Sequence, residues 1–76
     1  MGELTLKTKP ILKTEFEKWT GVIIEYRTGE KDVSYQLRIF LPNGNLHCDT
    51  RVHTIKHCKT VFAKFMEQKG LKWHSI

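Results

Sequence analysis

The sequence lacks a long hydrophobic run, because apolar stretches such as Val22 to Ile24 reach only three residues. A membrane-spanning helix needs about 20 predominantly apolar residues, so we expect no membrane partner. The first residues also lack the basic and apolar regions of a secretory signal peptide. These two absences predict a cytoplasmic protein.

The chain has too few residues for a large core. With 76 residues we expect one domain over 1–76, and a domain of this size buries only about 60% of the surface that its unfolded chain exposes. A deep cleft lined by many catalytic groups does not suit so thin a core. A binding module or accessory subunit is therefore expected rather than an enzyme.

Catalytic motifs are also absent. No glycine-rich phosphate loop, metalloprotease helix or nucleophile elbow occurs in the sequence. The carboxylates form no pair in a recognisable pocket, since Glu15 and Glu17 flank the apolar Phe16 and Asp49 is expected to face Arg38. We expect no catalytic residue and no cofactor.

Cysteine and histidine are few but close together, and both bind zinc at short spacings. No Cys-x2-Cys pair occurs. The elements predicted below point Cys48 into the core and His47 outward, and they separate His57 from Cys58 by about 100° on a helix. The ligands would have to converge from opposite faces, so we expect two buried thiols, surface histidines and no metal site. A Cys48–Cys58 disulfide fits sterically but not a cytoplasmic protein.

Residues 33–41 alternate apolar and polar side chains, which is typical of a half-buried strand. Asn43 and Gly44 then suit the two positive-φ positions of a type I′ turn, which predicts a hairpin. The register pairs Leu41 with Leu46, Ile39 with Cys48, Leu37 with Thr50 and Tyr35 with Val52. It also places Arg38 beside Asp49 on the opposite face.

The upstream half predicts a third strand and one ambiguous segment. Val22, Ile24 and Tyr26 alternate ahead of the polar loop 27–32, and they are expected to face the core with the hairpin. Residues 4–19 carry both patterns: alternation at the start and helical spacing later. We expect extended structure through Lys7 and a short helix over 11–19, with a fourth strand as the alternative.

A helix is predicted from Ile55 to Lys69, with Thr54 as N-cap, Gly70 in the left-handed C-terminal position and Leu71 packing back. Its apolar stripe holds Ile55, Cys58, Val61, Phe62, Phe65 and Met66. Its outward face holds Lys56, Lys59, Thr60, Lys64 and Glu67. Trp73 either docks on the sheet or stays exposed. The expected class is α+β, an antiparallel three- to four-stranded sheet packed on one C-terminal helix.

Positive charge is concentrated in the last thirty residues, which carry +4 of the chain's +5. Such a region suits phosphates, because neutralised phosphates release counterions. Two surfaces are candidates for nucleic-acid binding. The helix start offers Arg51, His53, Lys56 and Lys59, with Lys64 further along; the sheet face away from the helix offers Arg27, Arg38, Phe40, His47 and Arg51.

The order of elements over 22–70 resembles that of the double-stranded-RNA-binding domain, in which a basic cluster at the start of the last helix clamps phosphates. Lys56 and Lys59 match two of its three basic positions, and Cys58 and Ala63 match small-residue sites. Ile55 takes the third basic position, the loop 29–32 lacks the family's Pro and His, and Phe62 stands where the family prefers alanine.

Two further resemblances concern the order of elements alone. The span is similar to the three-strand-plus-helix arm-binding modules of phage integrases, which place their sheet in the major groove. If the N-terminal segment is a strand, the order is similar to that of single-strand-binding coactivator domains, with four strands and a helix. Each resemblance implies a nucleic-acid partner.

The alternative is a small protein-binding accessory or inhibitor factor. Trp and other aromatic side chains often anchor protein interfaces. Here Trp19, Trp73 and an exposed Phe40 on the sheet would serve as anchors. The sequence leaves open the choice between these partners and the oligomeric state.

Overall fold

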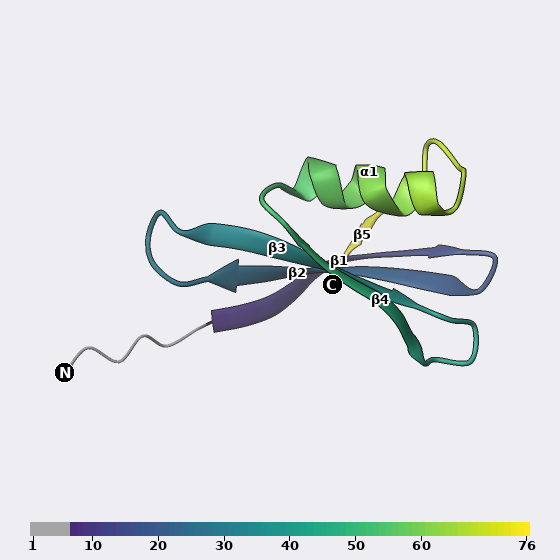
Figure 1. Ribbon diagram of the computed structural model, residues 1–76, viewed down its shortest axis with the longest axis horizontal. Helices are drawn as coiled ribbons and strands as arrows, with labels where there is room; N and C mark the ends of the chain where they lie inside the picture. The colour runs from purple at the N-terminus through teal and green to yellow at the C-terminus, as the bar shows by residue number, and fades with distance from the viewer. Residues whose placement is uncertain (1–6) are drawn as a thin grey trace.

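The computed structural model describes residues 7–76, so the extended structure expected at 4–6 lies outside the described residues. The elements follow in the order β1 (Lys7–Phe16), β2 (Trp19–Arg27), β3 (Val33–Phe40), β4 (Leu46–Val52), α1 (Ile55–Phe65) and β5 (His74–Ser75). One antiparallel sheet has the strand order β4-β3-β2-β1-β5, and α1 lies along one side of it (Figure 1). The α+β class is confirmed, with five strands in place of three or four.

β1 replaces the short helix predicted over 11–19. It pairs with β2 from Lys7 opposite Arg27 to Phe16 opposite Trp19. This ladder satisfies the backbone polar groups of the segment, which outweighs the helical spacing of a few apolar side chains. Glu17 and Lys18 form the connecting turn with φ of 47° and 72°, a conformation that normally selects Asn and Gly.

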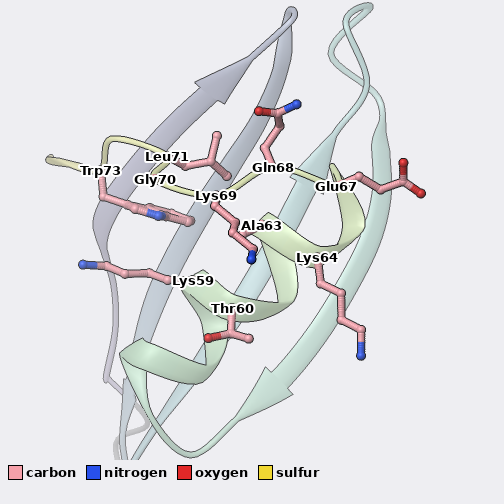
Figure 2. Close-up of a pocket in the computed structure, with 10 residues that line it drawn as sticks. All are labelled: Lys59, Thr60, Ala63, Lys64, Glu67, Gln68, Lys69, Gly70, Leu71 and Trp73. Carbon is pink, nitrogen blue, oxygen red and sulfur yellow. The ribbon is translucent and has the colours of Figure 1, made fainter.

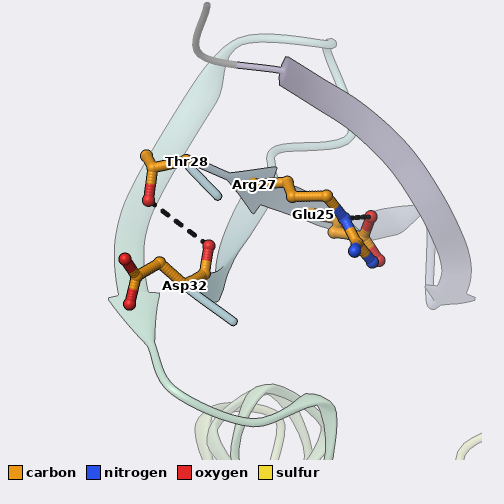
Figure 3. Close-up of polar contacts among 4 residues, drawn as sticks. All are labelled: Glu25, Arg27, Thr28 and Asp32. Carbon is orange, nitrogen blue, oxygen red and sulfur yellow. Dashed lines mark hydrogen bonds and ion pairs between the residues drawn. The ribbon is translucent and has the colours of Figure 1, made fainter. Parts of the chain in front are cut away.

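The loop 28–32 sets which face of β2 meets the helix. The Thr28 backbone N–H donates to the Asp32 carbonyl oxygen at 3.0 Å, and the Thr28 hydroxyl donates to the same oxygen at 3.3 Å (Figure 3). Arg27 thereby pairs with Val33, so odd-numbered residues of β2 oppose odd-numbered residues of β3. The core-facing residue of β2 is Ile23, opposite Leu37, and the prediction for Val22, Ile24 and Tyr26 is wrong.

The β3–β4 hairpin keeps most of the predicted register. Tyr35 opposes Val52, Leu37 opposes Thr50, Ile39 opposes Cys48 and Arg38 opposes Asp49. The turn differs from the predicted one. The Leu41 carbonyl oxygen accepts from the Gly44 N–H at 2.8 Å, and within this turn Gly44 has a positive φ, of 91°, whereas Asn43 does not. A type I turn over Pro42 and Asn43 suits proline's fixed φ. The extra loop residue shifts Leu46 opposite Phe40, away from the helix.

Helix α1 begins as predicted and ends earlier. The Thr54 side chain accepts from the His57 N–H at 3.1 Å, which confirms the N-cap. At the other end Glu67 adopts a φ of 54°, and its N–H bonds to the Lys64 carbonyl while the Gln68 N–H bonds to that of Ala63. This Schellman closure stops α1 at Phe65, so the predicted helix end at Lys69 is wrong. Gly70 does adopt the expected positive φ, of 77°, but in the segment after the helix.

The core lies between α1 and the sheet. Its buried apolar members are Ile23, Leu37, Ile39, Val52, Cys58 and Phe62. Phe62 lies directly over Gly21, where a β-carbon would come within 2.9 Å of its ring. The glycine is therefore required for α1 to approach β2 this closely.

Residues after α1 return across the same side of the sheet and join its edge. The buried Thr14 hydroxyl donates to the Lys72 carbonyl at 2.6 Å. Trp73 docks with its ring edge-on to Phe62, at 5.7 Å between centroids, and Leu71 packs against the core as predicted. β5 then pairs with β1, so the helix is not the last element.

Leu37→Ala tests the core. Leu37 is 0% exposed at the centre of the helix-facing side, so truncation leaves a cavity and is expected to lower the free energy of unfolding by about 2 to 5 kcal/mol. Urea denaturation measures this change. A loss below about 1 kcal/mol would contradict the face assignment.

The double variant Glu17→Asn with Lys18→Gly tests the β1–β2 turn. Both residues hold positive φ values, and Asn-Gly adopts this turn with far less strain, so we expect the free energy of unfolding to rise by about 1 to 2 kcal/mol. Gly44→Ala is the opposite control, with an expected loss of about 1 kcal/mol. An unchanged urea midpoint in the double variant would refute the positive-φ turn.

Candidate nucleic-acid interface

The sheet divides the predicted site residues between its two sides. Lys56, Lys59 and Lys64 lie exposed on α1. Strand alternation places Arg38, Phe40 and Arg51 on the opposite side, which we call the open face. Of the two placements predicted for Arg51, the one on the sheet face is confirmed and the one at the helix start is wrong. The two candidate surfaces do not merge.

The open face has its charges already engaged. Arg38 pairs with Asp49 at 3.7 Å, which confirms the predicted pairing, and Gln36 also donates to Asp49. The Arg51 guanidinium carbon lies 4.4 Å from the centroid of the Tyr26 ring, a cation–π contact. This face offers few cations free for phosphates.

His47 and Arg27 leave the open face altogether. His47 lies with Trp19 and Phe65 in an aromatic cluster on the helix side, with ring centroids 5.3 to 5.7 Å apart. Arg27 shares the helix-facing side with Glu25, to which its Nε lies at 3.4 Å (Figure 3). Of the five predicted sheet residues, only Arg38, Phe40 and Arg51 share one face.

Phe40 remains half-buried on the open face. Trp19 and Trp73, two side chains that might have covered it, both lie on the helix side. The other apolar residues near it on this face are Val22, Ile24, Tyr26 and Leu46. Among residues 7–76 the helix packs on the other side, so α1 does not cover this strip, although Ile24 within it is only 8% exposed and Arg51 lies over Tyr26.

A groove of about 940 Å³ runs between α1 and the segment that follows it (Figure 2). The floor is formed by Ala63, Leu71 and Trp73, and the rim carries Lys59, Lys64 and Lys69 with Glu67. No ion pair involves these three lysines within the part of the chain that the structure describes. We call this feature the lysine groove.

The sequence did not predict the lysine groove, because residues 67–69 were assigned to the helix. If the helix continued to Lys69, residues 67–69 would extend along the helix axis and would not form the segment that runs back beside α1. The available signal was Gly70 followed by the apolar Leu71 and Trp73, which indicates a returning segment. Lys69 and Trp73 are thus the site residues that sequence reasoning missed.

The two thiols are free and face the core side. Cys58 is fully buried, and burial raises its pKa to about 11. Cys48 is only half-buried and contacts the Thr50 hydroxyl at 3.4 Å. The four histidines are exposed as expected. In the described segment no three His, Cys, Asp or Glu side chains gather as a metal site.

No family model, curated protein or solved structure matches the chain. Within residues 7–76, no helix is both long and apolar enough to cross a membrane. The interface is therefore argued from its own geometry.

Thiol labelling tests the placement of the two cysteines. The thiolate is the reactive species, and Cys58 is both buried and shifted to a pKa of about 11. We expect dithionitrobenzoate at neutral pH to modify one thiol quickly and the other only as the protein unfolds. Cys48→Ser should remove the fast reaction. Two equally fast thiols would show that Cys58 is not in the core.

Proposed function

We propose that this protein is a small nucleic-acid-binding module that contacts the phosphate backbone through the exposed lysines of α1. The single observation that carries the proposal is that the lysines of α1 are exposed and have no acidic partner among the described residues. Lys56, Lys59 and Lys64 have no acidic partner among the described residues, whereas Arg38 on the open face is paired with Asp49. Unpaired surface cations are the ones that release counterions from phosphates.

The helix start adds to this potential. Thr54 caps α1 without adding charge, and the first turn contains no acidic residue. The partial positive charge of the helix N-terminus therefore acts in the same direction as Lys56. Backbone contacts of this kind position a protein on nucleic acid but carry little sequence information, so specificity is low.

The order of elements also supports the proposal. Four antiparallel strands precede one helix, the arrangement to which the sequence was compared in single-strand-binding coactivator domains. The likeness to the double-stranded-RNA-binding domain is weaker in its N-terminal part, where β1 occupies the place of a helix. These are likenesses of order, so the lysines carry the argument.

Lys56→Ala with Lys59→Ala tests the helix surface. Each phosphate-contacting lysine contributes about 0.9 to the slope of log K against log salt for duplex DNA, so the double variant should reduce the slope by about two. Different sequences should weaken equally. Fluorescence anisotropy between about 50 and 200 mM salt measures both effects.

Lys7→Ala with Lys9→Ala is the matched control, because it removes the same charge from exposed positions on β1. It should leave the slope nearly unchanged. Equal losses in the two double variants would indicate diffuse attraction by net charge rather than a surface on α1. Absence of binding to any oligonucleotide at 50 mM salt would refute the proposal.

A protein partner on the open face is the second candidate function. The observation that favours it is the partly exposed strip of Val22, Tyr26, Phe40 and Leu46, which α1 does not cover and of which Leu46 is 50% exposed. Aromatic and aliphatic side chains on a flat sheet suit a protein interface. Binding through this strip would be largely insensitive to salt, which separates it from phosphate binding.

A further inference from the structure

We propose that the lysine groove binds single-stranded nucleic acid, with a base stacked on Trp73 and backbone phosphates against Lys59, Lys64 and Lys69. This inference rests on the proposed function and narrows it, since it names the form of nucleic acid and a site for it. The lining residues supply the two chemical features that a single strand needs. These are an aromatic surface for a base and cations for its phosphates.

Hydrogen bonds to β1 from the residues before and after Trp73 in the sequence hold it in place. On its N-terminal side the Lys72 carbonyl accepts the Thr14 hydroxyl at 2.6 Å. On its C-terminal side His74 pairs with Lys13, and the Ile76 N–H donates to the Ile11 carbonyl at 3.1 Å. A tryptophan fixed in this way loses little conformational entropy when a base stacks on it.

The indole divides its surface between the core and the groove. Its ring lies nearly perpendicular to that of Phe62, with an interplanar angle of 72°. The side chain is only half-buried and lines the groove together with Leu71 (Figure 2). Part of the ring is therefore available to a ligand that enters between α1 and the C-terminal segment.

The lining lysines belong to both walls of the groove, and the Lys64 ammonium points away from Trp73. Lys59 and Lys64 come from α1, and Lys69 extends from the C-terminal segment towards the helix (Figure 2). Glu67 is the acidic residue of the lining, so positive charge dominates the rim. This charge is complementary to a polyanion and unsuited to a basic or apolar peptide.

A duplex meets only half of these features. Its phosphates reach the exposed lysines, but its bases are stacked on one another and paired, so no base face is free for Trp73. A single strand presents both groups together. The groove therefore favours single strands over duplexes of equal length.

Tryptophan fluorescence tests this directly, because the chain has only two tryptophans. In the Trp19→Phe variant, Trp73 is the sole reporter, and the packing of Trp19 against Phe65 is conserved by an aromatic replacement. We expect quenching on titration with a single strand of about 8 nucleotides. A duplex of equal length and inorganic polyphosphate should bind without quenching. Deoxyribose and ribose oligonucleotides of one sequence then distinguish DNA from RNA.

Two variants extend the test to affinity. Trp73→Ala should weaken single-strand binding by about 5- to 150-fold, the range for loss of one stacked base. Because Trp73 also packs on Phe62, its replacement can destabilise the fold. The double variant Lys59→Ala with Lys69→Ala tests the groove without changing a core contact. It should lower the salt slope for single strands by about 1.4, whereas Lys7→Ala with Lys9→Ala should not.

The outcomes separate this inference from the proposed function. Oligonucleotide binding without quenching of Trp73, and with a salt slope no lower in the Lys59 and Lys69 double variant than in Lys59→Ala alone, would overturn the groove and leave binding by α1 standing. Equal quenching by polyphosphate would overturn base stacking. Absence of any oligonucleotide binding at about 50 mM salt would overturn both.

Discussion

The contact of Phe62 with Gly21 is the constraint on which the other packing depends. A β-carbon at position 21 would lie 2.9 Å from the phenyl ring, so only glycine lets α1 lie this close to β2. The same ring contacts the edge of Trp73, and thus one side chain fixes both the helix and the segment that follows it.

The sequence pattern predicted the β3–β4 register and the start of α1, because each depends on local signals that agree. Arg38 beside Asp49 and the Thr54 cap are examples. The pattern did not predict which face of β2 packs against the helix, because the consecutive residues Val22, Ile23 and Ile24 put apolar side chains on both faces of the strand. What decides the face is the pairing of Arg27 with Val33 across the loop, a property of loop length that hydrophobic alternation does not report.

The candidate site was predicted in part for a related reason. Lys56, Lys59 and Lys64 are exposed on α1 as expected, because helical periodicity alone assigns them to its outer surface. The groove depends on where α1 stops, and the left-handed residue that ends the helix is Glu67, while Gly70, the predicted one, has its positive φ in the segment that follows. A glutamate is uncommon at such a position, so composition gave no indication that the chain turns back three residues early. Arg51 was assigned to both candidate surfaces, and the β3–β4 register places it on the open face only.

The wall of the lysine groove is attached to the sheet by β5, a strand of only two residues. Its ladder with β1 comprises the pairs Leu12 with Ser75 and Lys13 with His74. A segment held by a few solvent-exposed backbone hydrogen bonds opens by local unfolding, at a free energy that is a small fraction of the free energy of global unfolding. Amide protons of β5 are therefore expected to exchange with solvent much faster than those of β2 and β3.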